Sequence, residues 1–354
     1  MIEPIESISE AAPIKGARST SPKKPSPKSP RWKLLERKLS NLDSSLRDTD
    51  KEIEELIGTD ELTSLGAGGN SIGTFTAHST VTKKEFVVKV VKNKHALQLN
   101  REVQMTINFK HKHIRSALDP VHIGLHFSWA RFSFSPGYDL FTLTMEKSPP
   151  VPRKVPKKSK ELPILTGIRY VFTAILLALQ YLHFNKTVYN DLKPENIIVD
   201  AESLETVTKK TKVSLIDFGL SFFVGEAEEY TWGGTLDYSP PEKYTQDSDV
   251  GTPSDMFSFG VLLNSVCTQR QLFTQTKIPA DEQYDVLLNA ITSLQNNLKR
   301  SNRGVYSYKP VKEIVLRTVK FRPHLRATAT QLLELEFFTS DREMEISDET
   351  STVS

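Results

Sequence analysis

The sequence predicts an α+β fold in which a small strand-rich region precedes a larger, mainly helical one. Phe86–Val91 is a run of β-branched and aromatic residues typical of a strand. Ile168–Phe184 is a strongly apolar helical segment, and helical patterns continue as far as Ala329–Phe338. Because the strand patterns gather near the start of the region and the helices follow them, the two kinds of element are segregated rather than alternating.

The composition excludes several classes of protein. With 354 residues, 38% hydrophobic and 25% charged, the chain is neither collagen-like nor wholly disordered. The formal net charge of +3 (46 − 43) is too small to indicate nucleic acid as the main partner. The single cysteine, Cys267, excludes an internal disulfide and fits a reducing compartment. No apolar run reaches the length of a membrane span and Met1–Glu6 is no secretory signal, so we expect a cytoplasmic or nuclear protein without integral membrane association.

Residues 1–31 are expected to form a disordered basic tail. Between Ala11 and Leu35 there are seven basic residues and no acidic ones, interleaved with serine and proline. Such a stretch buries too little apolar surface to offset its ordering entropy. Its Ser-Pro steps fit either proline-directed phosphorylation, overlapping a nuclear import signal, or a plain solvated tail.

Residues 32–58 are expected to form an amphipathic helix, from about Trp32 to Ile57. Its apolar residues alternate at spacings of three and four. They are Leu35, Leu39, Leu42, Leu46, Ile53 and Leu56. The helix could bind a partner or a second copy, but so short a seam more often packs onto its own domain, which we favour.

The next segments set the order of the first domain. A glycine-rich turn, Gly66–Gly73, lies between strand-like flanks, and the Phe86–Val91 strand is followed by a helix at Leu97–Phe109. Leu140–Met145 is expected to be a further strand. Residues 147–160 then carry six basic residues, four prolines and no acid. This insert fits an acidic partner or membrane surface, or, as we favour, a solvated loop.

Four signals that carry chemistry follow in order after residue 60. The glycine-rich turn lets backbone N–H groups approach phosphate oxygens. Lys89 lies in the middle of an apolar strand and needs a buried partner, for which Glu102 is the nearest sensible carboxylate. The loop Tyr189–Ile198 gathers an aspartate, a lysine and an asparagine, and Asp217–Gly219 follows another strand. Each signal is weak alone, but together and in this order they are specific.

From about Glu61 to Phe338 the chain resembles the eukaryotic protein kinase family, on its serine/threonine branch. The matching motifs, in family order, are Asp191–Asn196, Asp217–Gly219, Ser239–Glu242, Pro253–Gly260 and Phe321–Arg326. In the last of these, an arginine pairs with the glutamate of Pro-Pro-Glu. The resemblance implies a bilobal kinase domain over residues 59–338, with a β-rich lobe at about 59–146, the insert at 147–160 and a helical lobe at about 161–338. Residues 339–354 are an acidic tail.

The resemblance also implies the roles of individual residues. ATP would lie between a strand-rich and a helical lobe, its phosphates held by Lys89, which Glu102 positions. Asp217 and Asn196 would bind Mg²⁺. Asp191 would orient the attacking hydroxyl and accept its proton, and Lys193 would neutralise the transferring phosphoryl group.

The remaining nucleotide contacts are implied in the same way. Met145 would be the gatekeeper before the adenine-binding backbone of Glu146 and Ser148. The other positions are Gly68 and Gly73 in the glycine loop, Phe75 and Val87 as a crowded adenine roof, and Ile198. A second register of the loop, on Gly66 and Gly68 with Ser71 at the third glycine, is the less favoured alternative.

Departures from the family pattern shape the expected function. Asn190 stands where most members carry the arginine that gathers a phosphorylated activation loop, so we expect activity that does not depend on phosphorylation there. Tyr189 replaces the usual histidine. Thr106 replaces an apolar residue and would loosen the helix that carries Glu102. The expected protein is a Mg²⁺- and ATP-dependent kinase acting on serine or threonine hydroxyls, with a pseudokinase scaffold or allosteric regulator as the alternative. Glu195 would favour a basic residue before the phosphoacceptor.

Overall fold

The computed structural model describes ten stretches of the chain, and these form two compact units. The described residues are 63–66, 71–78, 84–124, 127–152, 162–226, 234–244, 250–274, 278, 282–300 and 308–339. The N-terminal unit contains the described residues up to Ser135 together with Asp217–Gly219, and the C-terminal unit contains Pro136–Ile216 and the residues from Leu220 onward. The basic tail, the 32–58 segment, Gly68, most of the 147–160 insert and nearly all of the acidic tail lie outside the described residues.

The N-terminal unit is built on a five-stranded antiparallel sheet with the order β1-β2-β3-β5-β4. The strands are β1 (Thr63–Gly66), β2 (Ser71–His78), β3 (Glu85–Lys92), β4 (His122–Ile123) and β5 (Phe127–Ser133). The strand predicted at Phe86–Val91 is confirmed as β3, the central strand. The short 3₁₀ turn η2 (Asn93–His95) leads into helix α3 (Ala96–Ile107), close to the predicted bounds.

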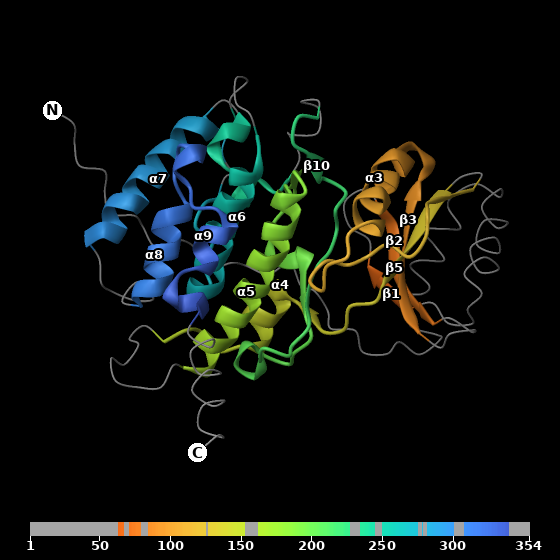
Figure 1. The fold of residues 1–354 in the computed structure, drawn as a ribbon, viewed down its shortest axis with the longest axis horizontal. Helices are drawn as coiled ribbons and strands as arrows, with labels where there is room; N and C mark the ends of the chain where they lie inside the picture. Colours follow the sequence, from red (N-terminus) through yellow and green to blue (C-terminus); the bar gives the residue numbers. More distant parts are fainter. Residues whose placement is uncertain are drawn as a thin grey trace, which may run out of the picture. The chain divides into compact units, whose positions relative to one another are not determined.

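Alternate residues of β3 pack on opposite faces of the sheet. Phe86, Val88 and Val90 belong to one apolar cluster, together with Trp129 of β5. Val87 and Val91 belong to a second cluster with residues of α3, which lies against this face (Figure 1). Because side chains alternate along a strand, Lys89 is on the α3 face, between two valines that pack there.

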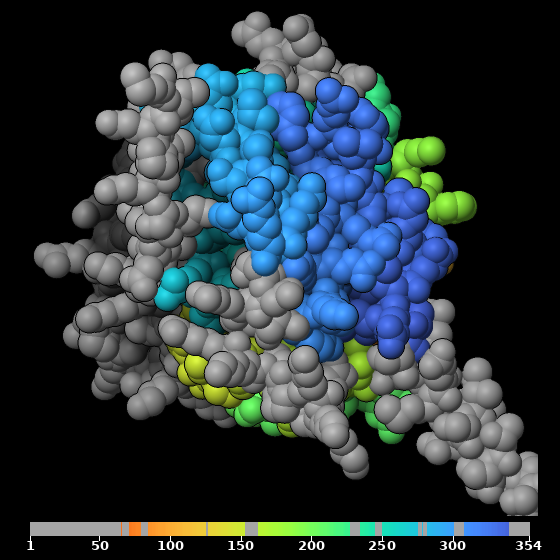
Figure 2. Space-filling view, turned by 90° about the vertical axis from the view of Figure 1, so that its left-hand side faces the viewer, coloured from red at the N-terminus to blue at the C-terminus, as the bar shows by residue number. Residues whose placement is uncertain are grey.

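The C-terminal unit is organised around α5, a helix buried on most of its sides. Its main helices are α5 (Pro163–Phe184), α6 (Thr252–Thr268), α7 (Gln283–Arg300), α8 (Lys309–Thr318) and α9 (Ala329–Leu333). Helix α5 contacts α6 and α9, and α6 also packs on α8. Helices α7 and α8 cover one outer face of this unit (Figure 2).

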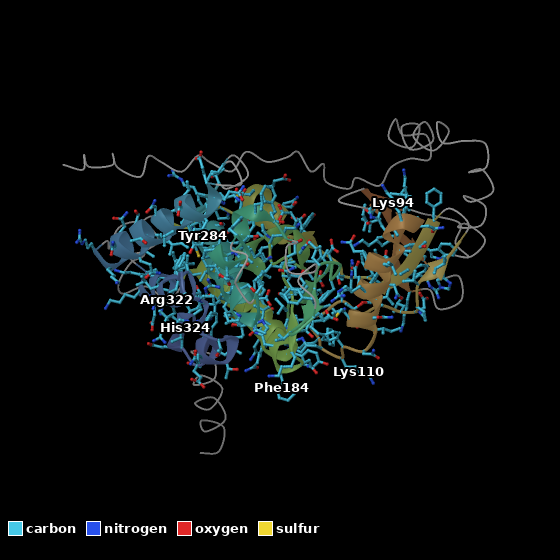
Figure 3. All side chains as sticks on the ribbon, turned by 90° about the horizontal axis from the view of Figure 1, so that it is seen from above. Lys94, Lys110, Phe184, Tyr284, Arg322 and His324 are labelled. Carbon is cyan, nitrogen blue, oxygen red and sulfur yellow. The ribbon has the colours of Figure 1, made fainter. Side chains whose placement is uncertain are left out.

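Helix α5 is long and apolar enough to cross a membrane by length and composition, and it is the one such helix in the described part of the chain. In the protein, however, 67% of its most apolar window is buried. Such burial is what the core helix of a domain shows. Its last residue, Phe184, projects from the surface with 84% of its area exposed (Figure 3).

Short strands and turns frame the loop that follows α5. Strand β7 (Thr187–Val188) pairs with β10 (Phe222–Phe223). Strand β8 (Ile197–Val199) lies between β6 (Tyr138–Asp139) and β9 (Val213–Leu215). The loop predicted to carry the catalytic residues therefore begins at one strand pair and ends in a three-stranded sheet.

The strand predicted at Leu140–Met145 is wrong. The segment is helical, with α4 (Leu140–Thr142) continuing into a π-helical turn, η3 (Leu143–Lys147). The Asp139 side chain accepts hydrogen bonds from the backbone N and Oγ1 of Thr142, at 2.9 and 2.8 Å, and this N-cap starts the helix. The sheet of the N-terminal unit receives its strand instead from Phe127–Ser133.

Candidate active site

The predicted ion pair of Lys89 is present in the N-terminal unit. The Lys89 ammonium lies 2.7 Å from Glu102 Oε2 and 2.9 Å from Asp217 Oδ1. Glu102 is fully buried on α3, whereas the Asp217 side chain is half-exposed. Burial opposes the charge of Lys89, but the attraction of the two carboxylates outweighs it and raises its pKa above the ordinary value. Lys89 is therefore a fixed cation.

Glu102 also faces a second cation that the sequence did not reveal. Arg115 Nη2 lies 3.7 Å from Glu102 Oε1, and its guanidinium lies 4.9 Å from the centre of the Phe132 ring. A buried carboxylate between two cations is better compensated than one with a single partner. Nothing in the local pattern around Arg115 indicated this contact, because it depends on how the loop after α3 returns to the helix.

Thr106 does not leave an unsatisfied group in the interior. It is buried on α3, and its hydroxyl donates to the carbonyl oxygen of Glu102 at 2.8 Å. Three residues further along the chain, Phe109 packs edge-on against Phe218, with ring centres 6.5 Å apart. The ring pair fixes the residue that follows Asp217 against the end of α3.

The strand register separates two residues that were expected to roof the adenine together. Phe75 of β2 faces Val88 and packs against the cluster on the sheet face away from α3, whereas Val87 belongs to the α3 face. Directly paired residues share a face, so Thr74 and Thr76, which pair with Lys89 and Val87, lie on the face that carries the lysine. The crowded roof is thus wrong, because the expected register was off by one position.

Gly73 and the Phe75 ring fit closely. A Cβ built on Gly73 would lie 2.5 Å from the tip of that ring. The aromatic side chain covers the glycine, so a larger residue at position 73 would require the Phe75 ring to move. Gly68 and the rest of the turn between β1 and β2 lie outside the described residues.

In the C-terminal unit, the Asp191 carboxylate is buried and held by three side chains. Lys193 Nζ lies 2.8 Å from Asp191 Oδ2, and Asn196 Nδ2 donates to the same oxygen at 3.0 Å. The Thr235 hydroxyl donates to Asp191 Oδ1 at 2.9 Å and accepts from Lys193 Nζ at 3.0 Å. The orientation of the Asp191 carboxylate is therefore fixed, and one of its oxygens already accepts a hydrogen bond from a hydroxyl group.

The backbone of the loop that carries Asp191 is anchored by Asp255 of α6. Its carboxylate accepts the N–H groups of Tyr189 and Asn190 at 2.9 and 2.8 Å and contacts His183 Nε2 at 2.9 Å. The Tyr189 hydroxyl in turn donates to the carbonyl oxygen of Ile216, and Asn190 Nδ2 donates to that of Leu220 at 2.9 Å. The replacements at 189 and 190 are thus both integrated into the loop.

Two site residues have left-handed backbone conformations. The φ angles are 72° at Asn190 and 62° at Asp217. Neither residue is glycine, so each conformation costs free energy of about 1 kcal/mol or more. The surrounding structure therefore imposes this backbone conformation on the residue before Asp191 and on Asp217 itself.

Met145, Glu146 and Ser148, which were expected to contact adenine, do not lie on or directly after a strand of the N-terminal sheet. Met145 and Glu146 lie in the π-helical turn, and Ser148 Oγ accepts the backbone N–H of Leu204 at 2.8 Å. The gatekeeper assignment rested on the strand at Leu140–Met145, and the structure has none. Ile198 is half-buried on β8, next to the loop that carries Asp191.

The pairing predicted between the Pro-Pro-Glu and late arginine segments is confirmed. Arg326 donates from Nη1 and Nη2 to the two carboxylate oxygens of Glu242, at 2.6 and 2.7 Å, and both side chains are buried. This bidentate pair ties the turn η8 (Pro241–Tyr244) to the segment before α9.

Asp217 of the N-terminal unit and Asn196 of the C-terminal unit each offer an oxygen atom of the kind that binds Mg²⁺. Asp217 offers a half-exposed carboxylate, and Asn196 uses its Nδ2 for Asp191, which leaves the amide oxygen as its atom for a cation. Hard oxygen ligands are the ones that Mg²⁺ prefers. Among the described residues there is no cluster of three or more histidines, cysteines or acids that could hold another metal.

Comparison with known proteins agrees with this geometry. The family model "Protein kinase domain" matches residues 59–338. This chain belongs to the protein kinase family. It is 30% identical over 226 residues to receptor-interacting serine/threonine-protein kinase 3 of Rattus norvegicus, which is 61% of this chain and 43% of the relative. It is 33% identical over 166 residues to serine/threonine-protein kinase Nek6 of Oryza sativa subsp. japonica, 46% of this chain and 27% of that one.

A third relative is serine/threonine-protein kinase SCH9 of Saccharomyces cerevisiae, 35% identical over 99 residues, which are 28% of this chain and 11% of the relative. The chain thus spans less than half the length of each of these three curated relatives. Its antiparallel N-terminal sheet followed by a mainly helical region is the kinase fold.

Proposed function

We propose that this kinase-family protein is catalytically active and transfers the γ-phosphate of ATP to serine or threonine hydroxyls of proteins. The observation that carries the proposal is the environment of Asp191, whose carboxylate oxygen accepts a hydrogen bond from the Thr235 hydroxyl at 2.9 Å. A carboxylate that binds one hydroxyl in this way can orient another and accept its proton. The relatives whose printed names describe serine/threonine kinases support the substrate class.

Each remaining group has a role in phosphoryl transfer. Lys89, held by Glu102, would bind the α- and β-phosphates, and Mg²⁺ held by Asp217 and Asn196 would neutralise phosphate charge when bound. Lys193, which contacts both Asp191 and Thr235, would stabilise the charge on the transferring phosphoryl group. Little covalent work is needed, so positioning supplies most of the acceleration.

We assign the adenine-contacting backbone to Ser133–Ser135, where β5 ends, in place of Glu146 and Ser148. Strand β5 pairs directly with β3, with Ala130 opposite Lys89, so its end lies on the sheet that carries the phosphate-binding lysine. Phe132, fully buried on the α3 face, then takes the gatekeeper position proposed for Met145.

Activity is proposed not to depend on phosphorylation between Asp217 and Glu242. Asn190 supplies no cation for a phosphate, and its side chain instead donates to the Leu220 carbonyl oxygen. Of the acidic residues in that loop, Glu226 accepts the backbone N–H of Phe223 at 2.9 Å and so shapes the start of the loop.

The substrate preference we propose is a basic residue on the N-terminal side of the phosphoacceptor. Glu195 lies near Asp139 and Asp191, and desolvation by the surrounding protein raises its pKa, with the negative charge of these two acids adding to the effect. Carboxylates gathered in this way create a negative potential, which a substrate cation relieves.

The test is transfer of labelled phosphate from Mg-ATP to a serine/threonine peptide library. Transfer should be lost in Asp191→Asn and kept in Asp200→Asn, the same change at an exposed aspartate. Tyr230→Phe with Thr231→Val should retain activity, and its loss in a folded protein would contradict phosphorylation independence. Nucleotide binding without transfer, in the absence of any activator effect, would instead favour the pseudokinase scaffold.

A further inference from the structure

Lys243 is a lysine buried inside the C-terminal unit, directly after the glutamate that pairs with Arg326. It lies on η8 with 6% of its surface exposed. Lysine is rarely buried unless a partner requires its charge. Its ammonium donates to the carbonyl oxygen of Asn190 at 3.2 Å.

That carbonyl belongs to the peptide bond between Asn190 and Asp191. A peptide unit is planar, so holding its oxygen also fixes the direction of the N–H on Asp191 and the start of that residue. Asp255 already holds the other side of Asn190, through the Asn190 N–H at 2.8 Å. Together, Lys243 and Asp255 hydrogen-bond to the two peptide groups on either side of Asn190, Lys243 to its carbonyl oxygen and Asp255 to its N–H.

Gly234 closes the same site from a third segment. Its φ is +117°, and a Cβ placed there would lie 2.8 Å from the Asn190 carbonyl oxygen and 2.9 Å from Lys243 Nζ. The backbone at Gly234 therefore approaches the very atoms that make the hydrogen bond. Only glycine allows this approach in this conformation, and Thr235, which bonds Asp191, follows it directly.

The charges that face Lys243 each have another cation or donor. They are Asp255 on α6, Asp191 on the catalytic loop and Glu242 on η8 itself. Asp255 contacts His183, Asp191 contacts Lys193, and Glu242 contacts Arg326. The ammonium of Lys243 is therefore attracted by three carboxylates, each of which also contacts another cation or donor.

Burial of this ammonium does not stabilise the fold by itself. Burial lowers the pKa of Lys243 to about 8, although the three carboxylates oppose the shift. A buried charge that its neighbours do not fully compensate is a cost to folding. Its presence at the peptide that carries Asp191 therefore indicates a role in the site rather than in stability.

We propose that Lys243 is a positioning residue for Asp191: its ammonium holds the Asn190–Asp191 peptide in place from inside the protein. The proposal rests on the proposed kinase activity. Lys243 thus provides a positive charge beside residue 190, which is itself an uncharged asparagine. The orientation of Asp191 then depends on a side chain that is always present, not on a modification.

The test compares Lys243→Met, which removes charge and donor at similar volume, with Lys243→Gln, which keeps a donor without charge. Lys309→Met is the matched control at an exposed lysine of the same unit. Two readouts are measured: kcat and KM for ATP across pH 6.5 to 9.5, and hydrogen–deuterium exchange of the amides of residues 185–196.

We expect Lys243→Met to lower kcat by about tenfold to a hundredfold, because a displaced catalytic group loses its alignment, with KM for ATP within about twofold of wild type. Lys243→Gln should fall between. The wild type should lose part of its kcat as pH rises through the range where Lys243 deprotonates, a step absent from Lys243→Met. Exchange at the amides of Tyr189 and Asn190 should be faster in Lys243→Met than in the wild type and should be unchanged in Lys309→Met.

Unchanged kcat and unchanged exchange in Lys243→Met would overturn the proposal. A uniform rise in exchange over the whole unit would also overturn it, because it would show a merely structural role. If the wild type has no activity at all, the kinase proposal fails, while the exchange experiment still decides whether Lys243 holds the loop.

Discussion

A partly exposed lysine and a buried one show how the same residue type acquires opposite properties from its surroundings. Lys89 sits 2.7 and 2.9 Å from two carboxylates, and their attraction raises its pKa despite burial. Lys243 faces carboxylates that are already paired, and burial lowers its pKa. The first lysine stays a cation, as its proposed role in phosphate binding requires. The second has a pKa of about 8, so the effects of its charge can be measured by varying the pH.

The residue-scale prediction concerns stability against pH. Lys243 has a folded pKa of about 8 and an ordinary value of 10.5, so the unfolded chain binds more protons between these values. Stability contributed by this group therefore rises as pH increases from about 8 to 10.5. Relative to Lys243→Met, the wild type should gain up to about 3 kcal/mol across this window, by the usual 1.36 kcal/mol per pKa unit.

Chemical denaturation of both proteins at several pH values measures this difference, with Lys309→Met as the reference for general alkaline effects. A gap between wild type and Lys243→Met that stays constant from pH 7 to 10.5 would show that Lys243 is not perturbed.

The sequence predicted those site residues whose partners lie at a fixed place in a motif. Lys89 and Glu102 were paired correctly because a lone lysine in an apolar strand needs a carboxylate on the next element. Arg115 and Lys243 were missed because their partners are set by tertiary packing. Phe75 was placed on the wrong face because a single irregularity between Ser71 and Gly73 shifts every later residue of β2.

At the scale of elements, the packing of α6 on α8 depends on one glycine. A Cβ on Gly260 would lie 2.1 Å from Thr318 Oγ1 and 2.7 Å from Val319 Cγ2. Thr318 and Val319 are fully buried, and the Thr318 hydroxyl is bonded to the Ile314 carbonyl oxygen at 2.8 Å. Neither side chain has space to move, so the helices approach as closely as glycine allows.

Gly260→Ala should therefore destabilise the C-terminal unit by about 2 to 3 kcal/mol, the cost of overpacking a core. The control is Gly251→Ala at the N-cap of the same helix, where the new Cβ would meet only Pro253 Cδ at 3.6 Å. This control should lose no more than about 1 kcal/mol. Equal losses in the two variants, measured by urea unfolding, would mean that α6 and α8 separate easily.

The type of an element was predictable where its hydrophobic residues followed one clear period, either that of a strand or that of a helix. The run at β3 and the long apolar helix α5 were both identified correctly. Leu140–Met145 alternates polar and apolar residues in a way that fits either a strand or a short helix. The Asp139 cap decides for the helix, through bonds that periodicity does not report.

At the scale of the whole molecule, the chain leaves the N-terminal unit after Ser135 and contributes Asp217–Gly219 to it again much later. The second contribution brings Asp217 to Lys89, so the lysine proposed to bind phosphate, its helix partner and a proposed magnesium ligand belong to one unit. This unit should therefore respond to nucleotide as a whole, and a ligand that binds only the folded form stabilises it by mass action.

Mg-ATP at a hundred times its Kd should raise the free energy of unfolding by about 2.7 kcal/mol. For a domain of this size that corresponds to about 5 to 10 °C in the thermal midpoint. Lys89→Met should remove most of the shift, because it deletes the cation that binds phosphate. Lys92→Met, the same change at an exposed position three residues along β3, should keep it. If Mg-ATP leaves the thermal midpoint of the folded protein unchanged, the protein would act through contacts with partners alone. If both variants lose the shift, the effect is not specific to Lys89, and the phosphates would bind elsewhere.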